Sequence, residues 1–531
     1  MAGEGEIQFP EPIIHRLQSI LTGKEAAQTT IVSKSWHSAW LTRPNLDFDD
    51  TYFGEYFHSN VDKFKIYAKK TIKRYEQLNL KIESFNLCME IDQYGRTALA
   101  KKLIMKALRI GATRLCVRLK RGDSFVLPNE VFGADNLVEL SVSGCRIKLD
   151  DGVVIKCRSL ESLSLDDVNG NYGIKMHVVS KIVSSCKSIE KFSLLSKIYE
   201  DYEYEFDHRA AARIKAAATA MAVAVVDDLI PRLRCLVLGF ESFKTLCLGD
   251  LLSRFPFLKD FTLCLNHTSS SRFDTIFEEG IQISNCSLER IKLVLQGFQS
   301  SDKIRRPRVK FDVPNVREFT FEGNVIPCLS FMSIPTSREW ESHLSIQCNH
   351  DNFSAFWLNE LSELLTKLSQ SKTHLSVNVG RNTSSFNYKV GDKITHGLRK
   401  HDLENLKIDM TGQPSLSCYA LFDGLFRLCR PKLITQYYKD VPVKRRYNHR
   451  YKNDSDMVKT NIDFLCQTLE EGINLKVSSP TQFMYGLNDL EEVNAQAFDM
   501  DNIPAEWKPI PFDEHVQAHQ RIRLLLKWKP S

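Results

Sequence analysis

The chain has 531 residues, 43% of them hydrophobic and 26% charged, and its formal net charge at pH 7 is +6. A chain of this length can bury a large core, and so modest a positive charge does not indicate an obligate nucleic-acid binder. The 14 cysteines include no C-x-x-C pair and the N-terminus has no apolar signal segment, so we expect reduced cysteines in the cytosol or nucleus. The most apolar run, 216–226, is too short to span a membrane.

The first predicted elements are three short helices within residues 9–50. Pro10 and Pro12 lie where the first helix begins. Its apolar residues recur on one stripe with a period of 3.6 residues: Ile13, Ile14, Leu17, Ile20 and Leu21. A second helix starts at Lys24, after Thr22-Gly23.

The third helix is opened by Ser33 and carries Trp36 and Trp40 on one face before Pro44 stops it. About forty residues cannot bury all of these apolar side chains among themselves. Some of the apolar surface must therefore face either the rest of the chain or another protein.

Residues 9–50 resemble an F-box, which has a Pro near its start, an Ile/Leu-rich first helix, a KEAAxTxxxSK second segment and a terminal Trp in this order. Here these are Phe9-Pro10, 13–21, 24–34 and Trp36. Phe9 replaces the usual Leu, an apolar exchange of small consequence. The continuation WHSAWLTRPNLDF is similar to plant F-box proteins that carry leucine-rich repeats.

This resemblance implies that residues 9–50 dock on the Skp adaptor of a cullin–RING ubiquitin ligase. Transferred residue by residue, the docking set is Pro10, Ile13, Ile14, Leu17, Ile20, Leu21, Val32, Ser33, Trp36 and Trp40. Trp36 is the expected hot spot, worth roughly 2–4 kcal/mol on truncation.

Residues 51–81 place aromatic and basic residues at helical spacing, which predicts a helix connecting the module to the following segment. Its basic face could touch phosphate, but it is typical of a solvated surface.

From residue 82 to residue 412 a phrase of the form apolar-x-x-apolar-x-apolar recurs about every 23 to 31 residues. The copy from Leu137 to Cys145 fits the leucine-rich-repeat phrase at every marked position. Eight further copies begin at Ile82, Leu160, Ile189, Leu233, Leu258, Leu288, Val316 and Leu403, with weaker ones near Ala112, Glu341 and Lys372. The pattern predicts an α/β fold in which the three-helix F-box precedes an irregular leucine-rich-repeat solenoid, or horseshoe. An unrelated α/β protein with scattered strands is the alternative.

In such a solenoid the strand residues between the inward apolar positions line the concave face. We expect a protein target to bind there, because the charges along the row have mixed signs and a polyanion would require a continuous basic stripe. The candidate residues are Arg114, Arg118, Glu139, Ser141, Ser164, Asp166, Lys191, Asp260, Arg290, Lys292, Glu318, Glu322 and Lys407. The same row also fits an ordinary solvated surface.

Two segments interrupt or follow the repeats. An acidic, aromatic stretch and an Ala-rich stretch at 199–228 predict an insertion, either a contact loop or an enlarged convex helix. Residues 413–531 form a C-terminal extension that starts with a helix at 417–428 and ends with a strand, RIRLLLKW. Its segment 430–452 interleaves basic and aromatic residues, a pattern found in single-stranded nucleic-acid binders, localisation signals and solvated loops.

The sequence contains no G-x-S-x-G, G-x-G-x-x-G or clustered Cys/His motif, so we expect no catalytic residue, metal or other cofactor. We interpret the chain as a non-catalytic, substrate-recruiting subunit of an SCF-type ubiquitin ligase, with a protein target and no nucleic-acid or membrane partner. The alternative is a leucine-rich-repeat scaffold unrelated to ubiquitin, in which the first three helices cap the solenoid.

Overall fold

A computed structural model describes most of the chain. It covers residues 9–53, 58–91, 96–122, 124–149, 152–168, 174–195, 198–199, 232–240, 248–266, 280–297, 306–333, 335, 339–348, 355–379, 400–409, 418–436, 465–466, 469–470, 473, 487–498, 506–509 and 521–529. The chain divides into two compact units, and each is described separately below. Unit 1 comprises residues 1–241 and 254–258, and unit 2 comprises 242–253 and 259–531.

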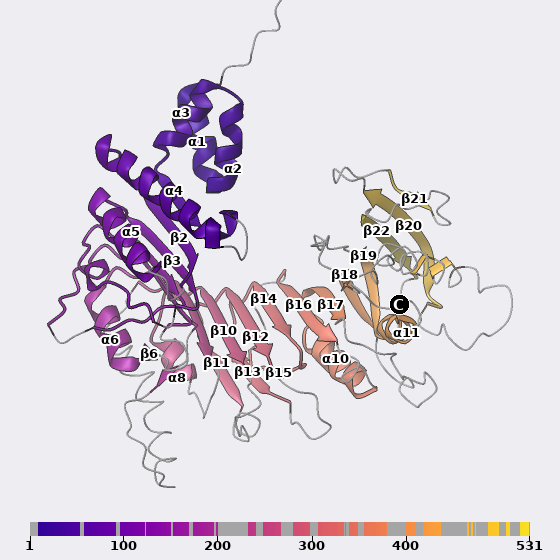
Figure 1. The fold of residues 1–531 in the computed structure, drawn as a ribbon. Coiled ribbons are helices and arrows are strands. Elements are labelled where there is room, and N and C mark those ends of the chain that lie inside the picture. The colour runs from indigo at the N-terminus through magenta and orange to yellow at the C-terminus, as the bar shows by residue number, and fades with distance from the viewer. Residues whose placement is uncertain are drawn as a thin grey trace, which may run out of the picture. The chain divides into compact units, whose positions relative to one another are not determined.

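Unit 1 begins with a helical module, whose helices are α1 (Glu11–Ile20), α2 (Gly23–Gln28), the 3₁₀ helix η1 (Thr29–Ile31) and α3 (Lys34–Thr42). Figure 1 shows α1, α2 and α3 grouped together at one end of this unit. Local chemistry fixes their ends. Thr22 and Glu25 form a reciprocal capping box at the start of α2, and the Ser33 hydroxyl accepts a hydrogen bond from the Trp36 amide at the start of α3.

The rest of unit 1 is built on a parallel sheet in which each strand pairs with the next. Its strands are β1 (Asn45–Asp49), β2 (Ser84–Glu90), β3 (Arg114–Lys120), β4 (Glu139–Ser143), β5 (Ser162–Asp166), β7 (Lys191–Leu195) and β9 (Cys235–Phe240). The connecting elements are η2 (Asp50–Phe53), α4 (His58–Gln77), α5 (Arg96–Ile110), η3 (Asn129–Val131) and α6 (Met176–Ser185), with a small pair β6 (Ile174–Lys175) and β8 (Ile198–Tyr199). The helix α4 lies within the predicted connecting segment 51–81. The strand β1 was not predicted, since the sequence analysis placed residues 45–49 within the helical module.

Unit 2 contains a second run of parallel strands. They are β10 (Asp260–Asn266), β12 (Arg290–Gln296), β14 (Glu318–Gly323), β16 (Glu341–Cys348), β17 (Lys372–Val379), β18 (His401–Asp409) and β19 (Cys429–Gln436). Three antiparallel strands continue from β19 in the order β22 (Arg521–Trp528), β20 (Leu490–Phe498) and β21 (Lys508–Pro509). Both β22 and the helix α11 (Cys418–Leu428) lie where the sequence predicts a strand and a helix. The other helices of this unit are α8 (Leu248–Ser253) and α10 (Ala355–Lys367).

Part of unit 2 has a second layer. The strands β11 (Ile281–Ser284), β13 (Arg308–Asp312) and β15 (Cys328–Phe331) form a separate parallel sheet, so the chain alternates between the two sheets from β10 to β16. Phe311 of β13 stacks on Phe331 of β15 at 5.1 Å and meets Phe319 of β14 edge-on at 5.5 Å. These rings fill the space between the layers, and the sequence phrase gave no sign of the second sheet.

The repeated apolar phrase forms the core of both units. All three apolar positions of all nine clear copies are buried, from Ile82, Phe85 and Leu87 to Leu403, Leu406 and Ile408. Alternate strand side chains face opposite sides of a sheet, so the residues between them face outward. Cys145, the last marked position of its repeat, is buried, whereas Asn266, in the same position of its repeat, is exposed.

Two predicted segments lie largely outside the residues that the structure describes. The insertion 199–228 lies outside the described residues except for Tyr199, and so does the basic segment beyond residue 436. The 12 cysteines whose side chains the structure describes are free, and burial raises the pKa of the Cys145 and Cys348 thiols to about 12. Among the helices of the described ranges, none has both the length and the apolarity that a membrane crossing needs.

Candidate functional site

The helical module has a small core of its own. Ile14, Ala26 and Ala39 are buried where the helices meet. Gln18 is buried as well, and its Nε2 donates to Thr29 Oγ1 and to the Trp36 carbonyl, both at 2.9 Å. This one amide therefore connects α1 to η1 and α3, and the buried alanines allow the helices to approach closely.

Larger apolar side chains of the module remain exposed. We call Phe9, Ile13, Ile20, Ile31 and Val32 the exposed apolar set of the module. Ile20, Ile31 and Val32 keep 70%, 90% and 65% of their surface accessible. Five of the fifteen exposed large hydrophobic residues in the described chain thus fall within residues 9–32. Such a concentration of exposed apolar side chains is typical of a surface that another protein covers.

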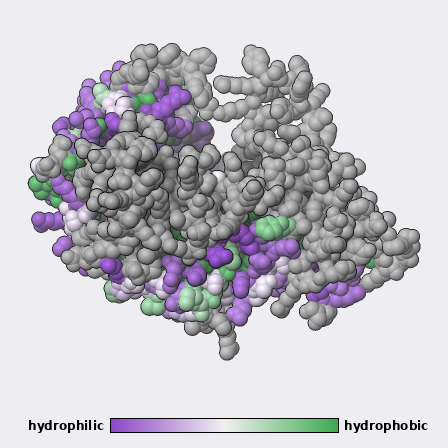
Figure 2. Space-filling view, turned by 90° about the horizontal axis from the view of Figure 1, so that it is seen from below, coloured by the Kyte–Doolittle hydropathy of each residue, from purple (hydrophilic) through white to green (hydrophobic). Residues whose placement is uncertain are grey.

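Elsewhere the exposed apolar residues are dispersed. Ile66 on α4, Phe257 in a turn, Met332 after β15 and Phe356 on α10 are exposed at separate places in the chain. Figure 2 shows hydrophobic residues scattered among hydrophilic ones on the described surface seen from below. Single exposed apolar residues of this kind are ordinary and need no partner.

The predicted docking residues fall into three classes. Pro10, Ile13, Ile20, Val32 and Ser33 are exposed, and Leu17, Leu21, Trp36 and Trp40 are half-buried. Ile14 is only 2% exposed, so we correct its assignment from a docking residue to a core residue. It shares the helical stripe with Ile13, and periodicity cannot tell which side of a stripe another helix covers.

The two tryptophans differ in their surroundings. Trp36 meets Phe9 edge-on with ring centroids 6.3 Å apart, next to the exposed apolar set. Trp40 instead lies near the Arg74 guanidinium of α4, 5.7 Å from its ring centre. Trp40 therefore packs against its own chain, and Trp36 is the better candidate for a partner contact. The sequence analysis missed Ile31, whose only signal was its position next to Val32.

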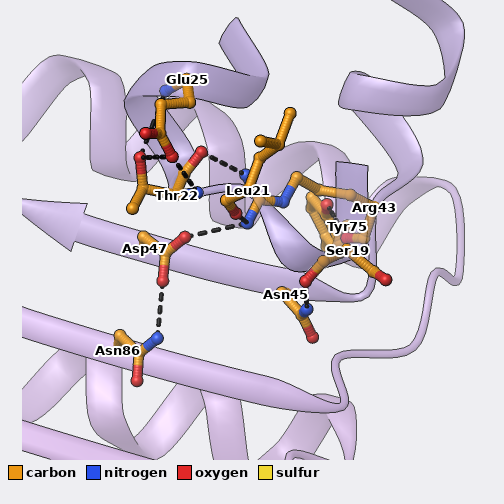
Figure 3. Close-up of polar contacts among 9 residues, drawn as sticks. All are labelled: Ser19, Leu21, Thr22, Glu25, Arg43, Asn45, Asp47, Tyr75 and Asn86. Carbon is orange, nitrogen blue, oxygen red and sulfur yellow. Dashed lines mark hydrogen bonds and ion pairs between the residues drawn. The ribbon is translucent and has the colours of Figure 1, made fainter. Parts of the chain in front are cut away.

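Arg43 joins the module to the sheet. The Arg43 side chain is only 4% exposed. Its Nη2 donates a hydrogen bond to Asp47 Oδ2 of β1 at 2.9 Å and another to the Leu21 carbonyl at 3.2 Å (Figure 3). Its Nη1 donates to the Thr22 carbonyl at 3.4 Å. The guanidinium thus satisfies the Leu21 carbonyl at the C-cap of α1. It gives the Thr22 carbonyl, which already accepts a hydrogen bond from the Ala26 amide of α2, a second donor.

Further contacts extend this junction, as Figure 3 shows. Asp47 Oδ1 accepts a hydrogen bond from Asn86 Nδ2 of β2 at 2.6 Å, and Asn45 Nδ2 donates to the Ser19 carbonyl at 2.8 Å. The Tyr75 hydroxyl of α4 donates to the Arg43 carbonyl, and burial raises the pKa of Tyr75 to about 12. The module is therefore held to β1 and α4 by buried and partly buried polar contacts, and Asp47 of β1 is held in turn to β2.

A cleft of about 270 Å³ opens beside this junction. It is lined by residues from the end of α1 and from β1, β2 and β3, among them Asp47, Asp49, Tyr52 and Arg118. Both signs of charge line it, so it has no clear preference for an anion or a cation.

The second candidate site is the strand face, which we define as the outward side chains of the parallel strands. Strand register places the predicted target-binding residues in rows across neighbouring strands. In unit 1, Arg114 pairs with Glu139 and Ser141 pairs with Ser164. In unit 2, Asp260 pairs with Arg290, which pairs in turn with Glu318. None of the thirteen predicted residues is buried. The repeat pattern thus predicted which side chains share this face within each unit.

Charges on the strand face largely neutralise one another. Arg290 Nη2 donates to Asp260 Oδ2 at 2.8 Å, and Lys292 Nζ is 2.7 Å from Glu322 Oε1. Such exposed pairs contribute little stability, but they leave a surface of alternating sign. This surface suits a protein partner with complementary polar groups better than a polyanion.

The described part of the basic segment 430–452 is also paired. Arg430 Nη2 lies 2.7 Å from Asp489 Oδ2, and Lys432 Nζ lies 2.6 Å from Glu404 Oε1. Hydrogen bonds from Lys400 and Arg430 lower the pKa of Asp489. These two cations are engaged within the fold, whereas the residues after 436 lie outside the described chain.

No protein-family model matches the chain. Among curated proteins it is 26% identical, over 207 residues, to a putative F-box/LRR-repeat protein of Arabidopsis thaliana, a match that covers 37% of this chain and 41% of the relative. An F-box/FBD/LRR-repeat protein of the same plant is 23% identical over 352 residues, covering 64% and 70% of the two chains. A further F-box/LRR-repeat protein is 26% identical over 205 residues, covering 37% and 40%.

These relatives confirm the resemblance to plant-type F-box/leucine-rich-repeat proteins. The chain spans about two fifths of the length of the first and third of them.

Proposed function

We propose that this chain is a substrate-recognition subunit of an SCF-type ubiquitin ligase. Residues 9–50 act as the F-box that binds a Skp-type adaptor, and through it a cullin–RING ligase. Residues 82–412 act as a leucine-rich-repeat solenoid that holds a protein target for ubiquitination, and residues 413–531 extend it. The complex works in the cytosol or nucleus.

The observation that carries this proposal is the exposed apolar set of the module. Ile20, Ile31 and Val32 are among the most exposed hydrophobic residues in the described chain, although the module already has a core of its own. Exposing such residues is unfavourable by roughly 25 cal/mol per Å² of apolar surface, so a partner that covers them would gain binding energy. The names of the relatives, which include the term F-box, support this interpretation of the module.

The proposed mechanism is proximity. The chain would hold a target lysine near the charged conjugating enzyme and so raise its effective concentration, without supplying an acid, a base or a nucleophile. Such a role requires a stiff connection between the two binding sites. The Arg43–Asp47–Asn86 contacts supply that stiffness between the module and the first strands of the sheet.

The adaptor contact is tested by affinity capture of a purified Skp-type adaptor with the intact chain. Combining Pro10→Ala with Trp36→Ala, or introducing Val32→Asp alone, is expected to abolish capture, because both remove or charge exposed apolar surface. Ile66→Asp on α4 is the matched control, since Ile66 is also an exposed aliphatic residue but lies outside the module. If the module variants still capture the adaptor, the chain is better explained as a repeat scaffold unrelated to ubiquitin.

The target contact needs a different comparison. Deleting residues 1–81 would also remove β1, the first strand of the sheet, so a point variant is the cleaner choice. Proteins captured from a plant extract by both the original chain and the Val32→Asp variant would belong to the strand face. The Arg290→Glu and Lys292→Glu variants are then expected to lose at least some of those proteins while they retain the adaptor.

A further inference from the structure

We propose that Glu341, His343 and His374 bind a divalent transition-metal ion, with Zn²⁺ as the best-suited ion. Glu341 and His343 are two residues apart on β16, so their side chains leave the same side of the sheet. His374 is the direct neighbour of His343 on the adjacent strand β17. The sequence analysis expected no metal site. The inference is independent of the proposed function.

The geometry of the three side chains supports a shared ion. The two imidazole rings stack with centroids 4.7 Å apart and planes 18° apart, and His343 Nε2 lies 3.4 Å from Glu341 Oε2. The three potential ligand atoms all lie within 4.8 Å of one another. Two ligands of one tetrahedral Zn²⁺ ion are roughly 3.4 Å apart, given bonds of about 2.1 Å. Small side-chain rotations would therefore bring the three atoms to one ion without backbone movement.

The backbone beneath the cluster is rigid. Both strands lie inside the parallel run of unit 2 and pair in register over eight residues. Alternate residues of β16, including Leu344 and Ile346, are buried in the core. A site on paired strands is positioned more accurately than one on a loop, which lowers the entropic cost of binding an ion.

The charges around the imidazoles favour a cation. Burial and the neighbouring His343 lower the pKa of His374. The acidic groups facing it are Glu341 on β16 and Glu404 on β18, and Glu404 is paired with Lys432. Glu341 thus provides the negative charge next to the two rings.

Two imidazoles and one carboxylate match the ligand preference of Zn²⁺ and of similar ions. Three protein ligands leave one coordination position for a water molecule or for a side chain of a bound protein. All three residues are at least partly exposed on the strand face, so an ion can enter from solvent.

The test is a calorimetric titration of Zn²⁺ into the intact chain after treatment with a chelator. We expect a saturable binding event whose affinity falls at least about 10-fold in His343→Ala and in His374→Ala, and to a smaller extent in Glu341→Gln. The control is His37→Ala, because His37 is an exposed histidine on α3, which belongs to unit 1, whereas the cluster belongs to unit 2. Co²⁺ should give the absorption bands of a tetrahedral site, and Mg²⁺ should not compete, because it prefers oxygen ligands.

Two further measurements separate ligand loss from misfolding. Zn²⁺ should raise the thermal unfolding temperature of the original chain and of His37→Ala but not of the cluster variants, whose circular dichroism should stay unchanged. Binding should weaken as the pH falls, because protons compete with the metal ion for its ligands. If folded His343→Ala and His374→Ala, or the milder His343→Gln and His374→Gln, bind Zn²⁺ as tightly as the original chain, the proposal is wrong.

Discussion

The helical module and the repeat strands use similar apolar residues in opposite ways. In the strands, the apolar positions of every clear repeat are buried, as Leu293 on β12 illustrates with no exposed surface. In the module, Ile20 and Ile31 lie largely in solvent although helix periodicity groups Ile20 with the buried Ile14. The strands complete their own core by stacking, whereas the module leaves part of its apolar surface exposed.

The difference shows that apolar content alone does not identify an interface. What distinguishes the module is that Ile14 is the one large apolar side chain buried within its three helices, and small or polar side chains, Ala26, Ala39 and Gln18, fill the rest of its interior. One hydrophobic stripe on a short helix can therefore contain both buried residues, such as Ile14, and exposed residues, such as Ile20.

The largest expected effect tests this contrast directly. Leu293→Ala should lower the free energy of unfolding of unit 2 by about 2–5 kcal/mol, because it leaves a cavity in the core. Ile20→Ala should change the free energy of unfolding by less than about 0.5 kcal/mol, because most of the deleted side chain is exposed to solvent and not packed in a core. Denaturant unfolding of both variants measures the difference. Equal losses would mean that Ile20 is covered by the chain itself.

A second variant is expected to loosen the helical module without affecting the repeat strands of unit 2. Arg43→Ala should weaken the junction by roughly 2–3 kcal/mol, because Asp47 and the Leu21 and Thr22 carbonyls lose a buried charged donor. Hydrogen exchange should then accelerate in α1 and α2 but not in β12 or β14. Lys106→Ala is the control, since it removes a partly exposed ion pair with Glu76 in the same unit. Unchanged exchange in the module would show that Arg43 is dispensable for its attachment.

A third prediction concerns a charge that unit 2 buries. Burial raises the pKa of Glu360 on α10 to about 7 from an ordinary value of 4.5, although Arg306 Nε lies 3.1 Å from its Oε1. The folded state therefore holds this proton more tightly than the unfolded state, and stability falls as pH rises from about 4.5 to about 7.

Glu360→Gln should remove that part of the pH dependence, a change on the order of 1 kcal/mol between pH 5 and pH 8. Urea unfolding across this range provides the measurement. Glu363→Gln is the matched control, because Glu363 pairs with the same Arg306 from an exposed position. The interpretation fails if the original chain and Glu360→Gln show the same dependence on pH.

The smallest loss of stability is expected for a residue that neighbours Leu293 in the sequence. Lys292 is adjacent to Leu293 on β12 but faces outward, where it pairs with Glu322. Lys292→Ala should therefore cost only about 0–1 kcal/mol, and less at high salt. Thermal unfolding at two salt concentrations checks this, and a loss comparable to that of Leu293→Ala would contradict the assignment of opposite faces.

The sequence predicted the strands well, for a physical reason. A buried strand face requires apolar residues at every second position, so the phrases at Leu137, Leu288 and Val316 indicate strand, face and register together. Even the weaker copies near Glu341 and Lys372 proved to be the strands β16 and β17. The outward rows of the strand face follow from the same rule.

Other features could not be predicted because they depend on contacts between distant residues. Nothing local marks Arg43 as the residue that joins the module to β1, or assigns Ile14 inward and Ile13 outward. His343 and His374 are 31 residues apart in the sequence, so no motif with metal-ligand spacing reveals them. They become neighbours because the strands pair in register and one repeat separates the two histidines.

Register pairing also explains how the repeats can differ in length. The interval between corresponding residues is 28 residues from Arg290 to Glu318 and 23 from Glu318 to Glu341, yet all three lie in one row. Residues added to or removed from a return loop leave the row unchanged, because hydrogen bonds between strands, and not chain length, set its position. Loops on the opposite edge are thus free to diverge while the order of side chains on the strand face is preserved.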